Sequence, residues 1–132
     1  MPELSIQIRD TEPPRVVKEA GLLRSALAQV AKDAAEKLAI IDLSASNGDT
    51  LSIVVGGTET VLGFTYGTNQ PPYFASRGLD TAIEPLLVAH QHFVQRVEFP
   101  RHAVIPWTSG VSAAEEFLET GTLPNCVQWQ EV

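Results

Sequence analysis

The chain has 132 residues, of which 16 are acidic and 9 are basic, so its formal net charge at pH 7 is −7. This length suits a single domain over residues 1–132, and the apolar fraction of 44% is ordinary for a folded protein. The acidic balance disfavours a general nucleic-acid binder and a protein that docks on an anionic membrane, because both need a basic surface. It is compatible with a basic protein partner, whose approach an acidic surface would steer.

The single cysteine, Cys126, cannot form an internal disulfide, which suits a reducing compartment. The first residues show no basic segment followed by an apolar run, so no signal peptide is expected. No apolar run approaches the roughly 20 residues needed to span a bilayer. These features together predict a cytoplasmic protein.

Hydrophobic periodicity predicts a strand and then a helix in the first third of the chain. Apolar residues alternate with polar ones over residues 4–10, which is typical of a short strand. From about Val17 to Leu38 the apolar residues recur three and four positions apart, which predicts a helix with one apolar stripe.

The period then changes to two, which indicates consecutive strands. The Asn47-Gly48 pair between the first two of them favours a tight hairpin turn. Residues 86–99 read either as one long strand or as a hairpin around the histidines. The other predicted strands are residues 39–45, 51–55, 60–66, 73–76 and 126–130.

A second helix is predicted between Pro106 and Gly121. Thr108, Ser109 or Ser112 is expected to cap its start, and Ser112 with Glu115 fits a capping box. Gly121 suits the left-handed residue that ends a helix. The element order predicts an α+β fold: an antiparallel sheet of about five to seven strands, with a long N-terminal helix and a C-terminal helix packed on it.

The sequence offers no coherent catalytic set, so neither an enzyme nor a cofactor is expected. Phosphate-binding glycine loops and a GxSxG elbow are both missing. Glu115 and Glu116 are adjacent, and neighbours on a helix diverge by about 100°, which makes a poor acid/base pair. Cys126 lies in an apolar strand context, which favours a buried, inert thiol.

His90 and His92 would face the same way on a strand and form a possible metal pair. No third ligand lies within five positions, and His102 would have to join by folding back. Exposed or hydrogen-bonded histidines are therefore favoured and no metal is assigned. A small-ligand or metal-binding domain that uses these three histidines stays open as the alternative function.

The charge pattern of the C-terminal segment is more informative. Arg101 is the last basic residue, and the four acidic residues beyond it have no basic neighbour in sequence: Glu115, Glu116, Glu119 and Glu131. A solvated face explains each charge singly. As a set, these charges form a plausible landing patch for a basic partner.

Three segments of the second half, "PYFASRG", "VEFPRHAVIP" and "AAEEFLETGTLPNCVQW", carry a resemblance to a known family. They match, in order, an aromatic strand ending in Ser-x-Gly, a Glu-apolar-Pro step, an Ile-Pro helix entry and a Phe-x-x-Thr-Gly-x-x-Pro helix end before a tryptophan. The matching residues are Tyr73, Phe74, Ser76, Gly78, Glu98, Phe99, Pro100, Ile105, Pro106, Phe117, Thr120, Gly121, Pro124 and Trp129. Together they resemble the Imm-one immunity-protein family of bacterial polymorphic toxin systems.

The resemblance implies a protein that binds a cognate toxin domain in the producer's cytoplasm and occludes its active site. Toxins paired with such proteins are often nucleic-acid deaminases or nucleases, whose basic clefts suit an acidic inhibitor. The expected partner is thus a protein, with no nucleic acid and no membrane, and the chain itself is expected to be a monomer or weak homodimer. Exposed carboxylates and aromatics are the expected contacts: Tyr73, Phe74, Asp80, Glu84, Glu98, Trp107, Glu115, Glu116 and Glu119.

Overall fold

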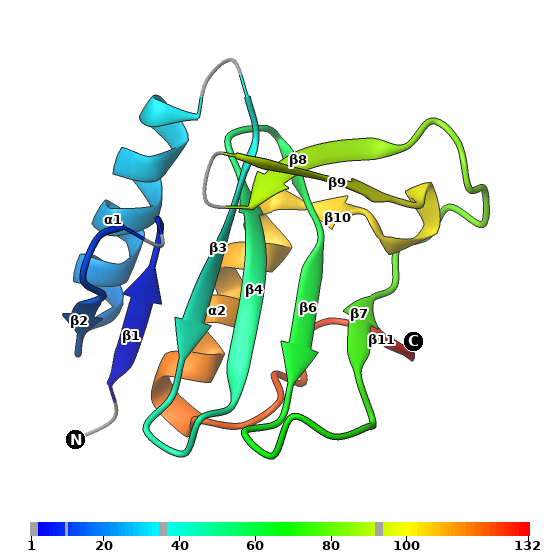
Figure 1. Cartoon of the computed structure of the whole chain (residues 1–132). Coiled ribbons are helices and arrows are strands. Elements are labelled where there is room, and N and C mark those ends of the chain that lie inside the picture. The colour runs from blue at the N-terminus through cyan, green and yellow to red at the C-terminus, as the bar shows by residue number, and fades with distance from the viewer. Residues whose placement is uncertain (1–2, 10, 35–36, 92–93) are drawn as a thin grey trace.

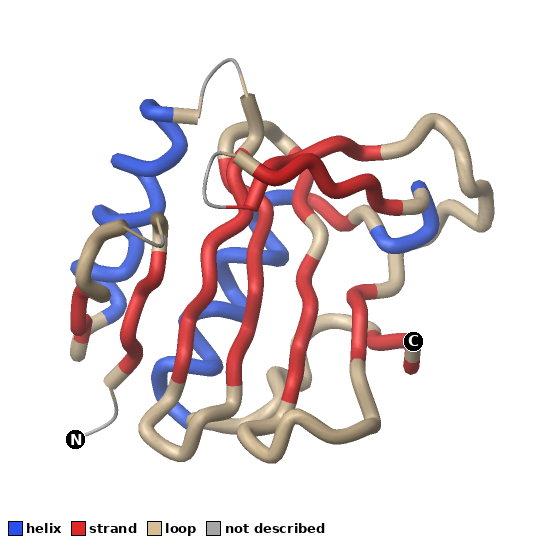
Figure 2. Tube along the Cα trace, viewed as in Figure 1, coloured by secondary structure: helices blue, strands red, loops and turns tan. Residues whose placement is uncertain are grey.

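The computed structural model of the chain describes residues 3–9, 11–34, 37–91 and 94–132. These residues form an α+β fold with a mostly antiparallel sheet and two α-helices (Figures 1 and 2). In chain order the elements are β1 (Leu4–Gln7), β2 (Arg15–Val17), α1 (Ala20–Asp33), β3 (Ala39–Ser44), β4 (Thr50–Val55), β5 (Glu59–Thr60), β6 (Leu62–Thr65), β7 (Phe74–Ser76), β8 (Leu87–Gln91), β9 (Gln95–Phe99), the 3-10 helix η1 (Arg101–Ala103), β10 (Ile105–Pro106), α2 (Trp107–Thr120) and β11 (Trp129–Glu131).

The main sheet has nine strands within the described residues, more than the predicted five to seven. Seven of them follow the order β11-β7-β6-β4-β3-β1-β2, and β8 pairs with β3 and with β9. Every pairing in this sheet is antiparallel except that of β3 with β8. The unpredicted strand β2 and the division of residues 86–99 into β8 and β9 account for the larger number. A separate two-stranded sheet joins β5 to β10.

One face of the sheet carries the main core, and both helices pack there. Alternate side chains of β3 and β4, such as Ile41 and Ile53, share this core with Leu27 of α1 and Phe117 of α2. The rings of Phe64 and Phe117 meet edge to face, with centroids 5.7 Å apart. Figure 1 shows α2 behind β3 and β4, and α1 beside β1.

A second, smaller core lies on the opposite side of β3 and β4. Ile40 and Val54 bury their side chains there together with Ala89 of β8, Ala103 of η1 and Val104. The β8–β9 hairpin and η1 therefore cover this part of the sheet. Their position brings the loop between β7 and β8 close to the start of α2.

The first helix is shorter than predicted. It begins at Ala20, because Val17 belongs to β2, where it is buried opposite Leu4 of β1. It ends at Asp33, and the cap residue Ala34 still donates its N–H to the carbonyl of Val30 at 2.9 Å. The missed strand β2 is only three residues long. Neither helix in the described part of the chain is long and apolar enough to cross a bilayer.

The predicted cap of the second helix is wrong, and its predicted end is confirmed. Helix α2 begins at Trp107 with Pro106 as N-cap and no side-chain cap. Thr108, Ser109 and Ser112 thus lie inside the helix, so Ser112 cannot form a capping box with Glu115. Gly121 ends the helix with a left-handed φ of 67°.

The strand predictions are mostly confirmed. The Asn47-Gly48 hairpin joins β3 to β4, and Gly48 has a φ of 91°. Residues 86–99 form the hairpin β8–β9, with residues 92–93 outside the described part. The predicted strand 60–66 is interrupted at Val61, between β5 and β6, and the last strand is shifted to Trp129–Glu131.

Candidate functional site

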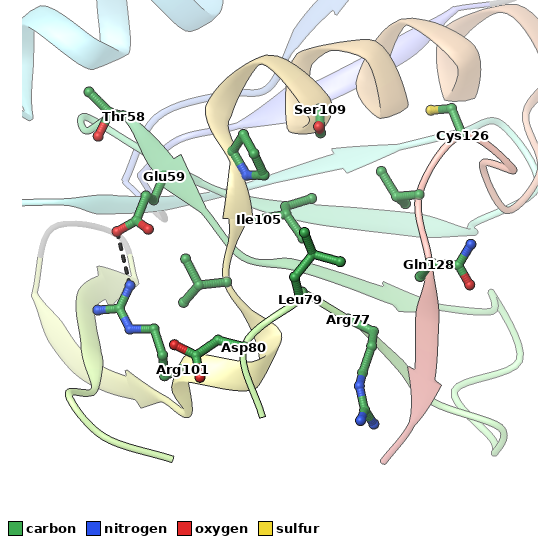
Figure 3. A pocket seen from close by; sticks show the side chains of 14 residues that line it. Thr58, Glu59, Arg77, Leu79, Asp80, Arg101, Ile105, Ser109, Cys126 and Gln128 are labelled. Atoms are coloured by element: carbon green, nitrogen blue, oxygen red, sulfur yellow. Dashed lines mark hydrogen bonds and ion pairs between the residues drawn. The ribbon is translucent and has the colours of Figure 1, made fainter. Parts of the chain in front are cut away.

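A surface depression of about 530 Å³ lies where five segments meet. Its walls come from β5, the loop after β7, η1 with β10, the first turn of α2 and the segment before β11. Figure 3 shows Glu59 and Arg101 on one side, Cys126 and Gln128 on the other, and Leu79 and Ile105 between them.

Arg101 holds three segments together at this depression. Its guanidinium Nη1 forms an ion pair with Glu59 Oε1 at 2.9 Å, and its Nε donates to the carbonyl of Pro85 at 3.0 Å. Its backbone N–H donates to the carbonyl of Ile83 at 2.8 Å. The Arg101 side chain is only 17% exposed, so these charge-assisted bonds are partly shielded from water. Arg101 thus ties the loop between β7 and β8 to η1 and β5.

The start of the same loop, residues 77–86, is also held tightly. The buried hydroxyl of Ser76 accepts the N–H of Leu62 at 2.9 Å and donates to the carbonyl of Ala103 at 2.6 Å. The N–H of Gly78 donates to the carbonyl of His102 at 2.7 Å. A Cβ at Gly78 would lie 2.1 Å from the carbonyl oxygen of Val104, so only glycine allows this approach.

Between these anchors, the loop exposes apolar side chains and carboxylates together. Leu79 is as exposed as in an extended chain (103%), and Ile83 is 63% exposed. Asp80 and Glu84 are exposed beside them, and Asp80 Oδ1 accepts the N–H of Ala82 at 2.9 Å. Large apolar side chains left in water and bordered by charge are typical of a protein-binding surface.

The structure brings together three of the nine predicted contact residues. Asp80 and Glu84 lie in the loop 77–86, and Glu98 lies on β9, which pairs with the strand that follows this loop. Glu98 is exposed and forms an ion pair with Arg96 at 2.9 Å. These carboxylates therefore share one end of the molecule.

The two aromatic residues at the beginning of β7 and just before it lie elsewhere. Tyr73 is exposed just before β7, and its hydroxyl donates to the carbonyl of Asn69 at 3.0 Å. Phe74 is half-buried and packs against the main core beside Tyr66. Phe74 therefore contributes to the core as well as to the surface.

Trp107 lies in a different depression, between the two helices. It is half-buried and lines a mostly apolar hollow of about 360 Å³ together with Leu27, Ala31 and Val111. Arg24 closes one side of this hollow. The tryptophan is thus separate from the loop 77–86.

Two of the three glutamates of α2 have hydrogen-bond partners, whereas the sequence indicated an acidic face without partners. Glu115 accepts two hydrogen bonds from Arg24 of α1, at 2.6 Å to Nε and 3.0 Å to Nη2. This contact lowers the pKa of Glu115, chiefly through the hydrogen bond from the guanidinium. Glu116 accepts the N–H of Asn125, whereas Glu119 is exposed. The prediction of an uncompensated acidic helix is wrong at Glu115, because its basic partner is distant in sequence.

Cys126 is exposed in the segment before β11, so the prediction of a buried thiol is wrong. Partial desolvation raises the pKa of this thiol, and the Glu116 carboxylate nearby raises it further. A raised pKa keeps the sulfur protonated near neutral pH, which is the opposite of an activated nucleophile.

The histidines do not come together as a metal site in the part of the chain that can be described. His90 lies on β8 with a buried Nδ1 that has no hydrogen-bond partner, and His92 lies outside the described residues. His102 is within hydrogen-bond distance of Gln130, at 3.1 Å. Among the described residues, no group of three histidine, cysteine or acidic side chains could hold a metal ion.

Sequence reasoning missed Arg101, Leu79 and Ile83. The available signal was weak: three large apolar residues, Leu79, Ile83 and Leu86, in a ten-residue segment that also contains glycine, proline and acidic residues. Because such a segment has no periodicity, its apolar residues carry no indication of burial or exposure.

The fold and site define an α+β protein with an anchored loop that exposes apolar and acidic side chains. The chain belongs to the immunity protein Imm1 family, whose model matches residues 12–131. This match extends over both halves of the chain, beyond the C-terminal segments that carried the resemblance. A comparison with curated protein sequences finds no match.

Several residues that carried the resemblance have clear structural roles. Phe117 is fully buried, and Gly121 ends α2. The indole N–H of Trp129 donates to the carbonyl of Pro124 at 2.7 Å. Ser76 and Gly78 anchor the loop 77–86, as described above. These residues stabilise the fold that presents the site.

Proposed function

We propose that this protein binds a cognate toxin domain of a bacterial polymorphic toxin system and neutralises it by covering the toxin's active site. It does so in the cytoplasm of the producing cell, as a single domain and without catalysis. Membership of the Imm1 family is the observation that carries this proposal.

The charge distribution supports a basic partner. Residues 1–38 hold six acidic and six basic side chains, whereas residues 39–132 hold ten acidic and three basic ones. The whole net charge of −7 therefore belongs to the later part of the chain. A toxin that acts on DNA or RNA, such as a deaminase or a nuclease, needs a basic cleft to hold the phosphates. An acidic protein that occupies this cleft excludes the nucleic acid.

Exposed carboxylates are suited to speed the encounter with such a cleft. Within the described residues, Asp80, Glu84 and Glu119 are exposed and have no basic partner. Electrostatic steering raises association rates by about 10- to 1,000-fold and weakens with salt. Buried apolar anchors are expected to set the lifetime of the complex.

Co-expression with the toxin domain encoded beside this gene tests the proposal. We expect the chain to restore growth to cells that make the toxin and to co-elute with it in gel filtration. A toxin made with an inactivated catalytic residue allows the complex to be purified without selection for resistance. If the neighbouring domain is toxic and this chain neither restores growth nor binds it, the proposed function is wrong for that pair.

Gel filtration of the chain alone tests the expected oligomeric state. A monomer, or a dimer that dissociates on dilution, agrees with the expectation. A dimer that persists at nanomolar concentration contradicts it.

A further inference from the structure

We propose that the loop 77–86 is the principal contact with the toxin. In this arrangement Leu79 and Ile83 enter an apolar recess of the toxin, and Asp80 and Glu84 pair with basic side chains at the recess's rim. The inference rests on the proposed function and adds to it the binding surface and the chemistry of the surface that it meets.

The apolar exposure of the loop is the first observation. Leu79, Ile83 and Leu86 all belong to the large apolar side chains that the described part of the chain leaves exposed. Leu79 also lines the depression of about 530 Å³ and lies beside Ile105 there (Figure 3); Val104 is a further apolar lining residue. Burying exposed leucine and isoleucine side chains in a partner removes apolar surface from water and so stabilises the complex. Such side chains are therefore natural anchors for a long-lived complex.

The loop is also held in place before any partner arrives. Backbone hydrogen bonds join Arg77 to Gln128 at 2.9 Å, Gly78 to His102 at 2.7 Å and Ile83 to Arg101 at 2.8 Å. The Arg101 guanidinium adds its bond to Pro85. A loop that is already ordered loses less conformational entropy on binding than a free one. This organisation favours a binding role over that of a simple linker between β7 and β8.

Charge defines the partner. Asp80 and Glu84 alternate with Leu79 and Ile83 along the loop, whereas Glu98 on the neighbouring hairpin is paired with Arg96. Glu59 lies across the depression but is neutralised by Arg101. The unpaired carboxylates of Asp80 and Glu84 outnumber the exposed Arg77 at the start of the loop, so the surface around the apolar side chains is net acidic and complements a basic rim around an apolar recess.

Two other surfaces offer apolar side chains to a partner, but their charges match a basic partner less well. The hollow that contains Trp107 is lined by Arg24, whose charge is paired with that of Glu115. The exposed Val16 and Leu22 near β2 lie in the part of the chain that has no net charge. The exposed Glu19 near Leu22 also has no basic partner among the described residues, but Arg15 and Lys18 lie close to it in sequence, so this surface is less acidic than the loop 77–86.

Binding of the purified, catalytically inactive toxin domain to single variants tests the inference. Leu79→Asp and Ile83→Asp are each expected to weaken binding by at least about tenfold, mainly through faster dissociation, as for anchor residues at other interfaces. Leu22→Asp is the matched control, because it places the same charge on an exposed leucine of α1. Circular dichroism and thermal unfolding show that each variant is folded.

Two double variants distinguish the local effect of the loop carboxylates on association from the effect of the chain's net charge. Asp80→Lys combined with Glu84→Lys is expected to slow association at least about tenfold at low salt. Glu3→Lys combined with Glu19→Lys changes the net charge by the same amount, but on the N-terminal part of the chain. This double variant is expected to slow association less than the loop variant does. Amide hydrogen exchange of residues 77–86 is expected to slow in the complex.

The outcomes distinguish the two proposals. If the unaltered chain does not bind the toxin, the proposed function and the inference both fail. The second case is that the unaltered chain binds the toxin, that Leu79→Asp and Ile83→Asp bind with affinities within twofold of it, and that amide exchange of the loop does not slow. The proposed function then stands, and the inference is overturned. A loss of binding in Leu22→Asp alone also overturns it, because the interface then lies on the helical side.

Discussion

The hydroxyl of Ser76, at the end of β7, donates a hydrogen bond to the main-chain carbonyl of Ala103 in η1, at 2.6 Å. The two residues are 27 positions apart, and their segments are two of those that carry the resemblance to the Imm1 family. The same hydroxyl accepts the N–H of Leu62, so it connects β6, β7 and η1. The exposed loop 77–86 begins directly after this buried junction.

Substitution Ser76→Ala is expected to lower the free energy of unfolding by about 1–3 kcal/mol, because it leaves a buried N–H and a buried carbonyl without their partner. Urea unfolding followed by circular dichroism measures this loss. Ser112→Ala is the control: Ser112 is exposed within α2, and the change should stay within about 0.5 kcal/mol. A loss of about 1 kcal/mol in Ser112→Ala would instead indicate that Ser112 caps the helix.

Two glycines with open space around them should respond to alanine in opposite directions. Gly121 has a φ of 67°, and an alanine there is expected to cost about 1–2 kcal/mol from the strain of the left-handed conformation. Gly21 lies within α1, where alanine is expected to gain up to about 0.5–1 kcal/mol. Thermal unfolding of both variants checks this. Equal effects of the two substitutions would contradict the backbone explanation.

The contact between Arg24 and Glu115 should make stability depend on pH. The contact lowers the pKa of Glu115 below its ordinary value of 4.5, so its stabilisation is present above that pH and is lost as the pH falls through the lowered value. Glu115→Gln is therefore expected to lower the Tm at pH 7, and the difference from the unaltered chain should vanish in acid.

Arg24→Gln removes the same contact and is the control for this comparison. The double variant should be no less stable than the less stable single variant, because both changes remove one interaction. A Tm difference for Glu115→Gln that grows as the pH falls would contradict the assigned contact.

Cys126 should react slowly with iodoacetamide at neutral pH although it is exposed. Its raised pKa keeps the thiolate fraction low, and the thiolate is the reactive form. The same chain unfolded in urea supplies the reference rate. Glu116→Gln removes the nearby charge and is expected to speed the reaction in the folded chain. A folded rate equal to or above the unfolded rate would show that the thiol is not suppressed.

The elements with a strong local pattern could be predicted from the sequence. The β3–β4 hairpin follows from two alternating apolar runs around Asn47-Gly48, and the end of α2 follows from Gly121. Strand β2 could not be predicted, because three residues show no period and Val17 continues the helical stripe. Its pairing with β1 buries Val17 in the sheet instead.

The candidate site was predictable only in part, for a related reason. Asp80, Glu84 and Glu98 could be proposed as acidic contacts, since charge is read directly from the residue type. Whether a charge is free depends on distant partners: Glu115 is paired with Arg24, 91 positions away. Likewise, nothing in the local pattern distinguishes the exposed Leu79 from a core leucine.

The sequence by itself determined the α+β class, the acidic balance and the family, because these follow from composition, local periodicity and motifs. Only the tertiary structure decided which apolar side chains and carboxylates are left exposed. Long-range contacts made by Ser76, Gly78 and Arg101 anchor the loop 77–86 and leave Leu79 in water. Exposure and pairing are properties of segments that meet in space, so no local pattern encodes them.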